Sequence, residues 1–228
     1  MNQIHISPSG RAKWSKVLTP NMKFADDKKP YGTFEQDLIL TQEAATPLIR
    51  LLTDLDNANF AQAASDALKS HQEKGGKGVF KDAADFAKKK KIERNPLPFK
   101  PEVDENLEET GGIVFKFKED ANWVRKSDGK EWDMTPKVVN AKNKPWDNSI
   151  EIGNGSIIKV AYEVSPYTKP CCGVSIKLRG VQVINLVEYG GGRDSEFFSE
   201  EEGDDIGAAV ADQASEMFAE QSAEDVPF

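Results

Sequence analysis

Two neighbouring stretches decide the fold: GNGSIIKVAYEVSPY at residues 153–167 and CGVSIKLRGVQVINLVEYGGG at residues 172–192. In both, apolar and polar side chains alternate with a period of two, which is typical of strands that bury one face. The residues expected to point inward are Ile158, Val160, Tyr162, Val164, Val174, Ile176 and Leu178. Gly180 interrupts the second pattern, and we expect a bulge or a sharp bend there.

Further strands are predicted on either side of a helical region. The stretches YGTFEQDLIL (31–40), GGIVFKFKED (111–120) and TPKVVNAK (135–142) read as strands, and the second places Ile113, Phe115 and Phe117 on one face. Residues 44–95 have helical spacing, with a start predicted at Pro47 and a stop at Gly75-Gly76. Five to six strands with one helical insertion favour a small, closed or nearly closed antiparallel barrel.

A lysine run ends the second predicted helix of this insertion. Lys88–Lys91 and Arg94 follow VFKDAADFA, and then PLPFKP breaks the regular pattern. Cations at the carboxyl end of a helix suit its dipole and stay solvated. The alternative is that they contact phosphate.

The net charge of −8 hides an uneven distribution. After Arg193 there are 12 acidic residues and no lysine or arginine, whereas residues 1–193 hold 30 bases and 26 acids, a net charge of +4. Such a division suggests a polyanion-binding body and an interaction tail. We therefore expect a folded domain over residues 1–192 and a mobile acidic arm over residues 193–228.

Little in the sequence points to catalysis. The only histidines, His5 and His71, lie far apart, and Cys171-Cys172 has no partners for a metal site. The glycine-rich segments lack the phosphate-loop and dinucleotide-binding patterns. We predict no catalytic residue, no metal and no cofactor. With no signal peptide and no apolar run of membrane-spanning length, a soluble cytosolic protein is expected.

Aromatic residues are interleaved with cations. Each of the four tryptophans lies within a few residues of a lysine or arginine. Single-stranded nucleic acid requires this combination, because cations follow the phosphates while aromatic faces accept unstacked bases. The alternative for each tryptophan is packing at the edge of the core, which we expect for at least two of the four.

Taken together, GGIVFKFK, the two strand stretches with Pro166-Tyr167 between them, the triple glycine and the acidic tail resemble a known family. This is the family of single-stranded DNA-binding proteins of lytic tailed phages. The resemblance implies an OB-fold with an inserted helix, and sequence-independent binding during DNA replication, recombination and repair. It also implies a tail that recruits DNA polymerase and helicase-primase in the cytoplasm of the infected bacterial host. Members can dimerise, so a homodimer is left open.

The candidate DNA-binding residues have two sources. The resemblance implies Tyr167 in the Pro-Tyr loop, Lys116 and Lys118 on the FKFK strand, and Trp123 after it. Strand alternation and proximity to aromatic residues add Arg125, Lys126, Lys169, Lys177 and Arg179. At the tail tip, which resembles that of bacterial single-strand binding proteins, the candidate partner-binding residues are Asp225, Val226, Pro227 and Phe228.

The acidic tail predicts an internal competitor for a cationic groove. A tethered anion acts at an effective concentration of about millimolar until DNA displaces it, and the tip, with Phe228 and its α-carboxylate, then addresses a partner. Two alternatives are a protein-interaction scaffold whose acidic arm mimics nucleic acid, and a nuclease or recombinase subunit. The second is disfavoured by the lack of a carboxylate cluster in the part of the sequence expected to be ordered.

Overall fold

The structure is a computed structural model that describes residues 3–23, 25, 30–125, 127–169 and 171–188. These residues belong to one compact unit, Met1–Tyr189, and form ten strands and two helices. The tail predicted over residues 193–228 lies outside the described residues, and the division of the chain at residue 192 stays a prediction.

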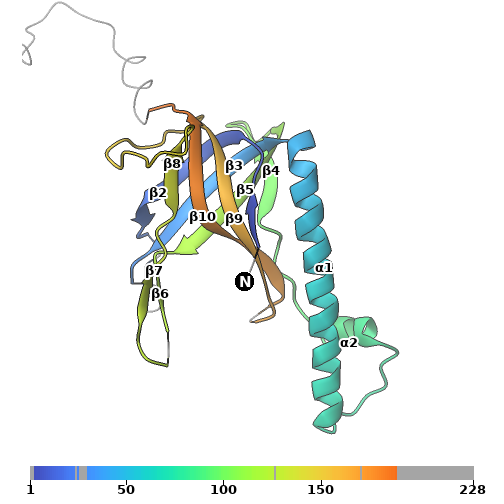
Figure 1. The fold of residues 1–228 in the computed structure, drawn as a ribbon. Helices are drawn as coiled ribbons and strands as arrows, with labels where there is room; N and C mark the ends of the chain where they lie inside the picture. Colours follow the sequence, from blue (N-terminus) through green and yellow to red (C-terminus); the bar gives the residue numbers. More distant parts are fainter. Residues whose placement is uncertain (1–2, 24, 26–29, 126, 170, 189–228) are drawn as a thin grey trace, which may run out of the picture. The chain divides into compact units, whose positions relative to one another are not determined.

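Five strands close into a ring (Figure 1). In order around the ring these are β2 (Gly10–Asn21), β3 (Thr33–Thr41), β5 (Glu109–Asp120), β10 (Gly173–Asn185) and β9 (Ile157–Tyr167), which pairs back to β2. Four of these pairings are antiparallel, while β5 and β10 are parallel. A ring with an odd number of strands cannot alternate direction throughout, so one pair must be parallel. The predicted OB-fold barrel is confirmed, with this one departure from a fully antiparallel arrangement.

The core lies inside the ring and contains the residues that alternation predicted. Phe115, Phe117, Ile158, Val160 and Leu178 are fully buried, and Val174 and Ile176 are nearly so. The rings of Phe117 and Tyr162 are 5.4 Å apart between centroids and tilted by 55°, a favourable aromatic contact. The bulge predicted at Gly180 is also present, because the β9–β10 register shifts between Leu178 and Gly180.

Five shorter strands complete the sheets: β1 (Ile4–Ile6), β4 (Phe99–Val103), β6 (Asn122–Val124), β7 (Glu131–Asp133) and β8 (Lys137–Asn140). Strands β2 and β4 were not predicted. Alternation in β2 is broken by a register shift between Lys13 and Lys16, where Trp14 has a φ of 56°. Strand β4 pairs only with β5 and contains Pro101, which an edge strand tolerates because no further strand needs its missing N–H.

Helix α1 (Gln42–Glu73) begins five residues before the predicted start at Pro47. Thr41 is its N-cap, and the Thr41 Oγ1 atom accepts a hydrogen bond from the Ala44 N–H at 3.3 Å. Because Thr41 is also the last residue of β3, the helix follows the strand without a loop. Pro47 therefore lies inside the helix, where its missing N–H leaves one intrahelical hydrogen bond unmade. The predicted stop is confirmed, with Gly75 at a φ of 68°.

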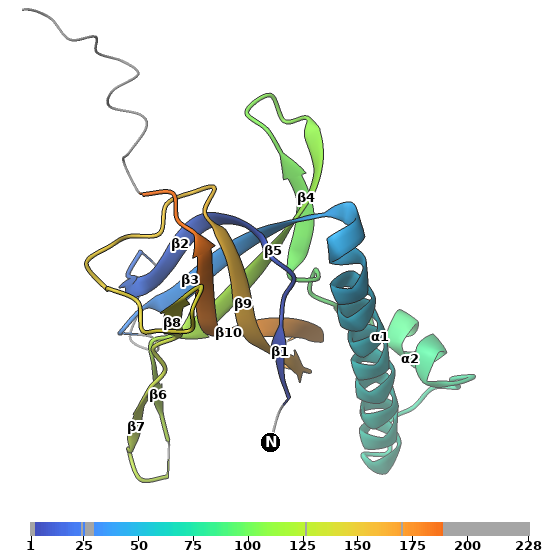
Figure 2. The same cartoon turned by 45° about the horizontal axis from the view of Figure 1, so that its top comes forward.

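Helix α1 stands beside the barrel and carries a second, shorter helix at its far end (Figure 2). Leu48 and Leu52 of its first half are buried against the barrel core. Helix α2 (Ala83–Lys89) packs on the second half through the rings of His71, Phe80 and Phe86, whose centroids are 4.9 to 5.5 Å apart. The helical insertion predicted over about residues 44–95 is thus a folded part of the unit.

Candidate nucleic-acid interface

Two lysines lie side by side on the outside of the barrel where β5 meets β10. Lys118 and Lys177 are direct register partners in the parallel pairing. Lys116 projects from the same face of β5, two residues earlier. The three ammonium groups thus come from two strands that are adjacent in space, although the paired residues Lys118 and Lys177 are 59 residues apart in sequence.

Carboxylates of the neighbouring strand β3 partly neutralise these lysines. Lys118 Nζ lies 2.7 Å from Glu35 Oε1, and Lys116 Nζ lies 4.0 Å from Asp37 Oδ2. Burial raises the pKa of Asp37, and the nearby Lys116 opposes that rise. Both lysine side chains remain about half exposed, so an incoming anion can reach them without unfolding the strand.

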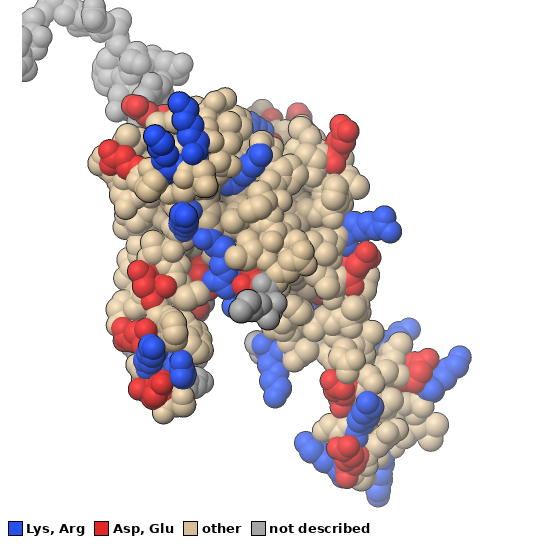
Figure 3. Space-filling view, viewed as in Figure 1, with Lys and Arg blue, Asp and Glu red and all other residues tan. Residues whose placement is uncertain are grey.

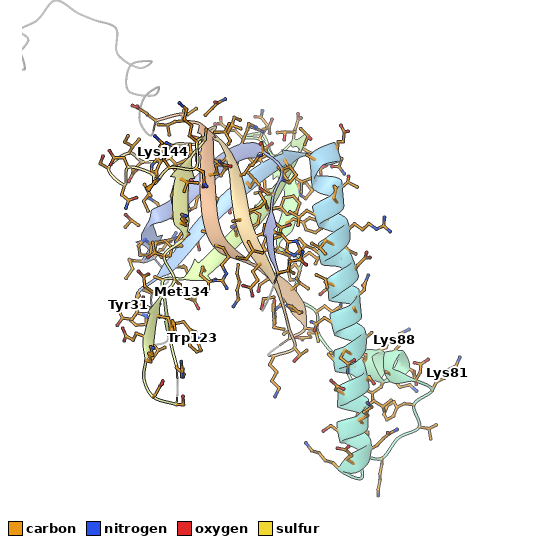
Figure 4. All side chains as sticks on the ribbon, viewed as in Figure 1. Tyr31, Lys81, Lys88, Trp123, Met134 and Lys144 are labelled. Carbon is orange, nitrogen blue, oxygen red and sulfur yellow. The ribbon has the colours of Figure 1, made fainter. Side chains whose placement is uncertain are left out.

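A hairpin beside the lysines carries two tryptophans. Strands β6 and β7 pair antiparallel, with Trp123 directly opposite Trp132. The turn between them contains Asp128-Gly129, and Gly129 has a φ of 68°. Trp123 is 52% exposed and Trp132 is 41% exposed, values that leave ring faces available for stacking. In Figure 4 the hairpin projects from the barrel with Trp123 on it and with Tyr31 and Met134 at its base.

The hairpin and the lysines line a single pocket of about 440 Å³. Its lining residues are Thr33, Lys118, Glu119, Asp120, Trp123, Trp132, Met134, Ser175 and Lys177. We call this cavity the Trp–Lys pocket. It combines flat aromatic surface with ammonium groups, which is the combination that unstacked bases and their phosphates require.

Cations also surround the second tryptophan. Lys130 Nζ lies 4.5 Å from the centre of the Trp132 ring, and the Arg125 guanidinium lies 5.8 Å from it. Arg125 also forms an ion pair with Asp128 at 3.3 Å across the turn. Lys126, predicted to join this group, lies outside the described residues.

Tyr167 and Lys169 are at the far end of the same sheet face. Tyr167 pairs with Gly173 across β9 and β10, four residues along β10 from Lys177, or roughly 13 Å at the usual rise per residue. Its hydroxyl accepts a hydrogen bond from Asn95 Nδ2 at 2.9 Å, and its carbonyl accepts one from Asn59 Nδ2 at 2.8 Å. Lys169 is exposed in the turn that follows.

Arg179 is held in an ion-pair network. As the extra residue of the β10 bulge, it lies 2.6 Å from Glu119 Oε2 and 2.9 Å from Glu163 Oε2, and only 22% of its side chain is exposed. Burial raises the pKa of Glu119, and the Arg179 guanidinium opposes the rise. This arrangement secures the strand more directly than it offers a contact to a ligand.

The structure therefore brings together part of the predicted set. Lys118, Trp123 and Lys177 share the Trp–Lys pocket, with Lys116 and Arg125 at its margins. Tyr167 shares the face but not the pocket, and Lys169 follows it in the β9–β10 turn. Asp225, Val226, Pro227 and Phe228 lie outside the described residues. The assignment of all these residues to DNA or partner binding stays a prediction.

Trp132, Lys130 and Met134 were missed as site residues. The signal that could have found them is Asp128-Gly129 between two short stretches that each contain a tryptophan, because Asp-Gly is a strong hairpin signal. The expectation that at least two tryptophans pack at the core edge was wrong. Only Trp146 does so, donating its indole N–H to the Ile150 carbonyl at 2.9 Å, whereas Trp14, Trp123 and Trp132 are exposed.

The described residues contain neither a candidate metal site nor a membrane-spanning helix. In this part of the chain, no three or more His, Cys, Asp or Glu side chains gather in a way that could hold a metal ion. Nor does either described helix combine the length and the apolar character needed to cross a bilayer.

Comparison with known proteins places these features in a family context. Residues 10–188 match the family profile described as single-stranded DNA-binding protein, bacteriophage T7. The chain is 25% identical over 176 residues to the single-stranded DNA-binding protein of Enterobacteria phage T3, covering 76% of this chain and 70% of the relative. It is 32% identical over 109 residues to that of Escherichia phage T7, covering 45% of this chain and 47% of the relative.

The fold has a similar solved structure. The crystal structure of gp2.5, a single-stranded DNA binding protein encoded by bacteriophage T7, superposes with a TM-score of 0.61 at 22% identity. The match covers 90% of this chain and 98% of the other. At this level of identity the likeness supports the barrel and its inserted helix.

Proposed function

The chain belongs to the family of phage single-stranded DNA-binding proteins of the bacteriophage T7 type, and on this premise we propose that it binds single-stranded DNA through the Trp–Lys pocket. One observation carries the proposal of the site: Lys118 and Lys177 lie in register beside Trp123 and Trp132 in one cavity. Base stacking on an aromatic ring contributes about 1–3 kcal/mol per base, and the ammonium groups pair with phosphates.

Binding through these groups is independent of sequence. Every base has an aromatic face, and every nucleotide has the same phosphate, so neither the tryptophans nor the lysines distinguish one base from another. The protein then acts by holding a strand and protecting it, with no catalytic step of its own.

We further propose that the protein serves DNA replication, recombination and repair in the cytoplasm of the infected bacterial host. The support is the family and the charge distribution, because 12 acidic residues and no lysine or arginine follow Arg193. The acidic tail competes with DNA for the pocket, and when DNA displaces it the tip recruits replication proteins such as DNA polymerase and helicase-primase. A homodimer is compatible with this arrangement.

Intrinsic tryptophan fluorescence tests the site. Oligo-dT should quench the fluorescence of the full chain, and the Trp123→Ala and Trp132→Ala variant should lose most of the quenching and bind about 10- to 100-fold more weakly. Trp146→Phe is the matched control, because Trp146 packs on the core and should leave the affinity unchanged. An equal loss in both variants, or in neither, would remove the pocket from the mechanism.

The alternative functions give different results in simple assays. A protein-interaction scaffold whose tail mimics nucleic acid would not retain labelled single-stranded DNA on a filter. A nuclease or recombinase subunit would shorten or exchange labelled DNA in the presence of Mg²⁺, whereas we expect the DNA to be recovered intact.

A further inference from the structure

The excess positive charge of the body lies on one part of the fold, the helical lobe formed by residues 69–94. This segment has nine lysines and arginines and four acids, a net charge of +5. Residues 1–188 as a whole have 29 bases and 26 acids, a net charge of +3, so everything outside the lobe sums to −2. Figure 3 shows the cationic side chains spread over the lobe, and all nine are exposed. A polyanion is therefore attracted to the lobe first.

The lobe is folded, so its charges are held in place. Phe80 and Phe86 pack against His71 of α1, and Asp82 caps α2 by accepting a hydrogen bond from the Asp85 N–H at 2.8 Å. Lys89 has a structural role, since its Nζ lies 2.9 Å from Asp85 Oδ2 and 5.6 Å from the centre of the Phe80 ring.

The helix dipole accounts for only some of the lysines in the lobe. Only Lys88 and Lys89 lie in the last turn of α2, where the dipole favours a cation. Lys77, Lys81 and Lys91 lie outside that turn. The side chains of these three lysines, and that of Lys88, form no ion pair within the described part of the chain. Figure 4 shows Lys81 and Lys88 at the α2 end of the lobe.

The lobe is attached beside the predicted DNA-binding face. After α2 the chain returns to the β9–β10 turn, where the Cys172 N–H donates to the Glu93 carbonyl at 3.1 Å and the Asn95 N–H donates to the Cys172 carbonyl at 2.7 Å. Asn95 also donates its side-chain amide to the Tyr167 hydroxyl. A strand that leaves the Trp–Lys pocket along β10 therefore reaches Tyr167 and then the base of the lobe.

The chemistry of the lobe differs from that of the pocket. Its two phenylalanines face its own small core, Phe86 is buried, and no tryptophan or tyrosine lies between residues 69 and 94. Bases thus have no ring to stack on, while the phosphodiester backbone has several unpaired ammonium groups. We propose that the lobe is a second DNA site that holds only the backbone beyond the Trp–Lys pocket. This proposal rests on the proposed function.

The phosphates can come from a longer single strand or from a duplex flanking the single-stranded segment, and the length of the probe tests both. One probe is an oligo-dT of about six nucleotides, close to the lower range for one OB-fold. The second is an oligo-dT of about 20 nucleotides, and the third joins the short oligo-dT to a duplex. Lys88→Gln with Lys91→Gln is compared with Lys142→Gln and Lys144→Gln, which remove the same charge from an exposed loop.

We expect the lobe variant to bind the short probe like the unmodified chain. On the long or the junction probe, or on both, its affinity at low salt should fall about ten-fold, and the slope of log K against log salt should become shallower by about 1–2. If affinity falls on the long probe alone, the lobe contacts the phosphates of the single strand that occupies the pocket. If affinity falls on the junction probe alone, the lobe contacts the phosphates of the flanking duplex. The control should match the unmodified chain on all three probes.

Equal binding of all probes by the lobe variant and the unmodified chain would overturn the proposal, and it is the result expected if the lobe binds an acidic polypeptide. The proposal would also be overturned if the lobe variant lost as much affinity for the short probe as for the longer probes, or if the control variant lost as much affinity as the lobe variant. Either result would mean that only the net charge of the protein had changed the affinity. Failure of the unmodified chain to bind any probe would instead contradict the proposed function. Coincident thermal unfolding curves confirm that both variants are folded.

Discussion

At the residue scale, the carboxylates next to the lysines of the candidate interface are as informative as the lysines. Strand alternation predicted that Lys116, Lys118 and Lys177 face outward, and all three do. It did not predict that Asp37 and Glu35 lie beside two of them, because cross-strand partners depend on the register between β3 and β5. Arg179 illustrates the same limit, since only the folded bulge reveals its two acidic partners.

The raised pKa of Asp37 predicts a pH dependence. Burial raises it above the ordinary value of 3.8, while Lys116 and Lys118 oppose and Glu35 reinforces the rise. As the pH falls toward this raised value, Asp37 becomes neutral and Lys116 is released for phosphate, so the affinity for DNA should rise. The folding stability should change with pH in the same direction as the affinity, rising as the pH falls. This is because a folded state in which an acid has a raised pKa loses stability as the pH rises through that pKa.

Asp37→Asn should therefore bind oligo-dT about two- to five-fold more tightly at pH 7, in line with a partly exposed ion pair. Its affinity should also depend less on pH than that of the unmodified chain. Fluorescence titration at a series of pH values checks this, with Asp54→Asn on the exposed face of α1 as the control for the lost charge. A variant that is weaker at pH 7 would contradict this role for Asp37.

Gly173 tests whether Tyr167 takes part in binding. A Cβ atom at Gly173 would lie 2.5 Å from the Tyr167 hydroxyl oxygen, closer than real side-chain contacts allow. Gly173→Ala should displace the ring and weaken oligo-dT binding by about 1–3 kcal/mol, the contribution of one stacked base. Tyr167→Ala should show a similar loss, whereas Tyr167→Phe retains the ring and should bind almost normally. Unchanged affinity in both alanine variants would exclude Tyr167 from the interface.

At the element scale, strands with unbroken alternation were predictable and interrupted strands were not. The patterns of β3, β5 and β9 continue through each strand, and that of β10 runs unbroken up to the bulge at Gly180, so their inward faces are those of the structure. Strand β2 escaped because of the irregularity at Trp14. The β6–β7 hairpin escaped because each strand has only three residues, too short for a period to show.

The short hairpin predicts a separation of binding from stability. An isolated two-stranded hairpin is marginally stable, and Gly129 is in the left-handed region that a branched side chain disfavours. Gly129→Val should cost about 1–2 kcal/mol locally, loosen the pairing of Trp123 with Trp132, and weaken oligo-dT binding several-fold. The melting temperature, which reports on the barrel, should change little. A large fall in melting temperature with unchanged binding would contradict this separation.

At the scale of the whole molecule, the charge distribution was readable from the sequence alone. The acidic run after Arg193 and the basic body need no structure to be counted. The structure adds that the basic excess is on the helical lobe, while lysines and carboxylates are balanced on the barrel face beside the Trp–Lys pocket. A pocket with so little net charge holds a single strand largely through its rings, and an anionic competitor needs a high local concentration to occupy it.

Truncation after Arg193 tests that competition. Suppose that the tail binds its own body with a dissociation constant of about 0.1 mM. At a local tail concentration of about 1 mM, molecules with an occupied pocket then outnumber those with a free pocket roughly ten to one. Removing the tail should tighten oligo-dT binding about ten-fold at low salt. It should also steepen the salt dependence of binding, because in the full chain salt weakens the competing tail as well as the DNA contacts and the two effects partly offset each other. Removing only Val226–Phe228 is the control, since it leaves all 12 acids in place and should leave DNA binding unchanged. Equal low-salt affinities of the truncated and full chains would exclude the tail as a competitor.

Deletion of Val226–Phe228 also tests the role given to the tip of the tail. This deletion should abolish the retention of replication proteins on the immobilised protein. Retention of these partners without the tip would exclude the role given to Phe228.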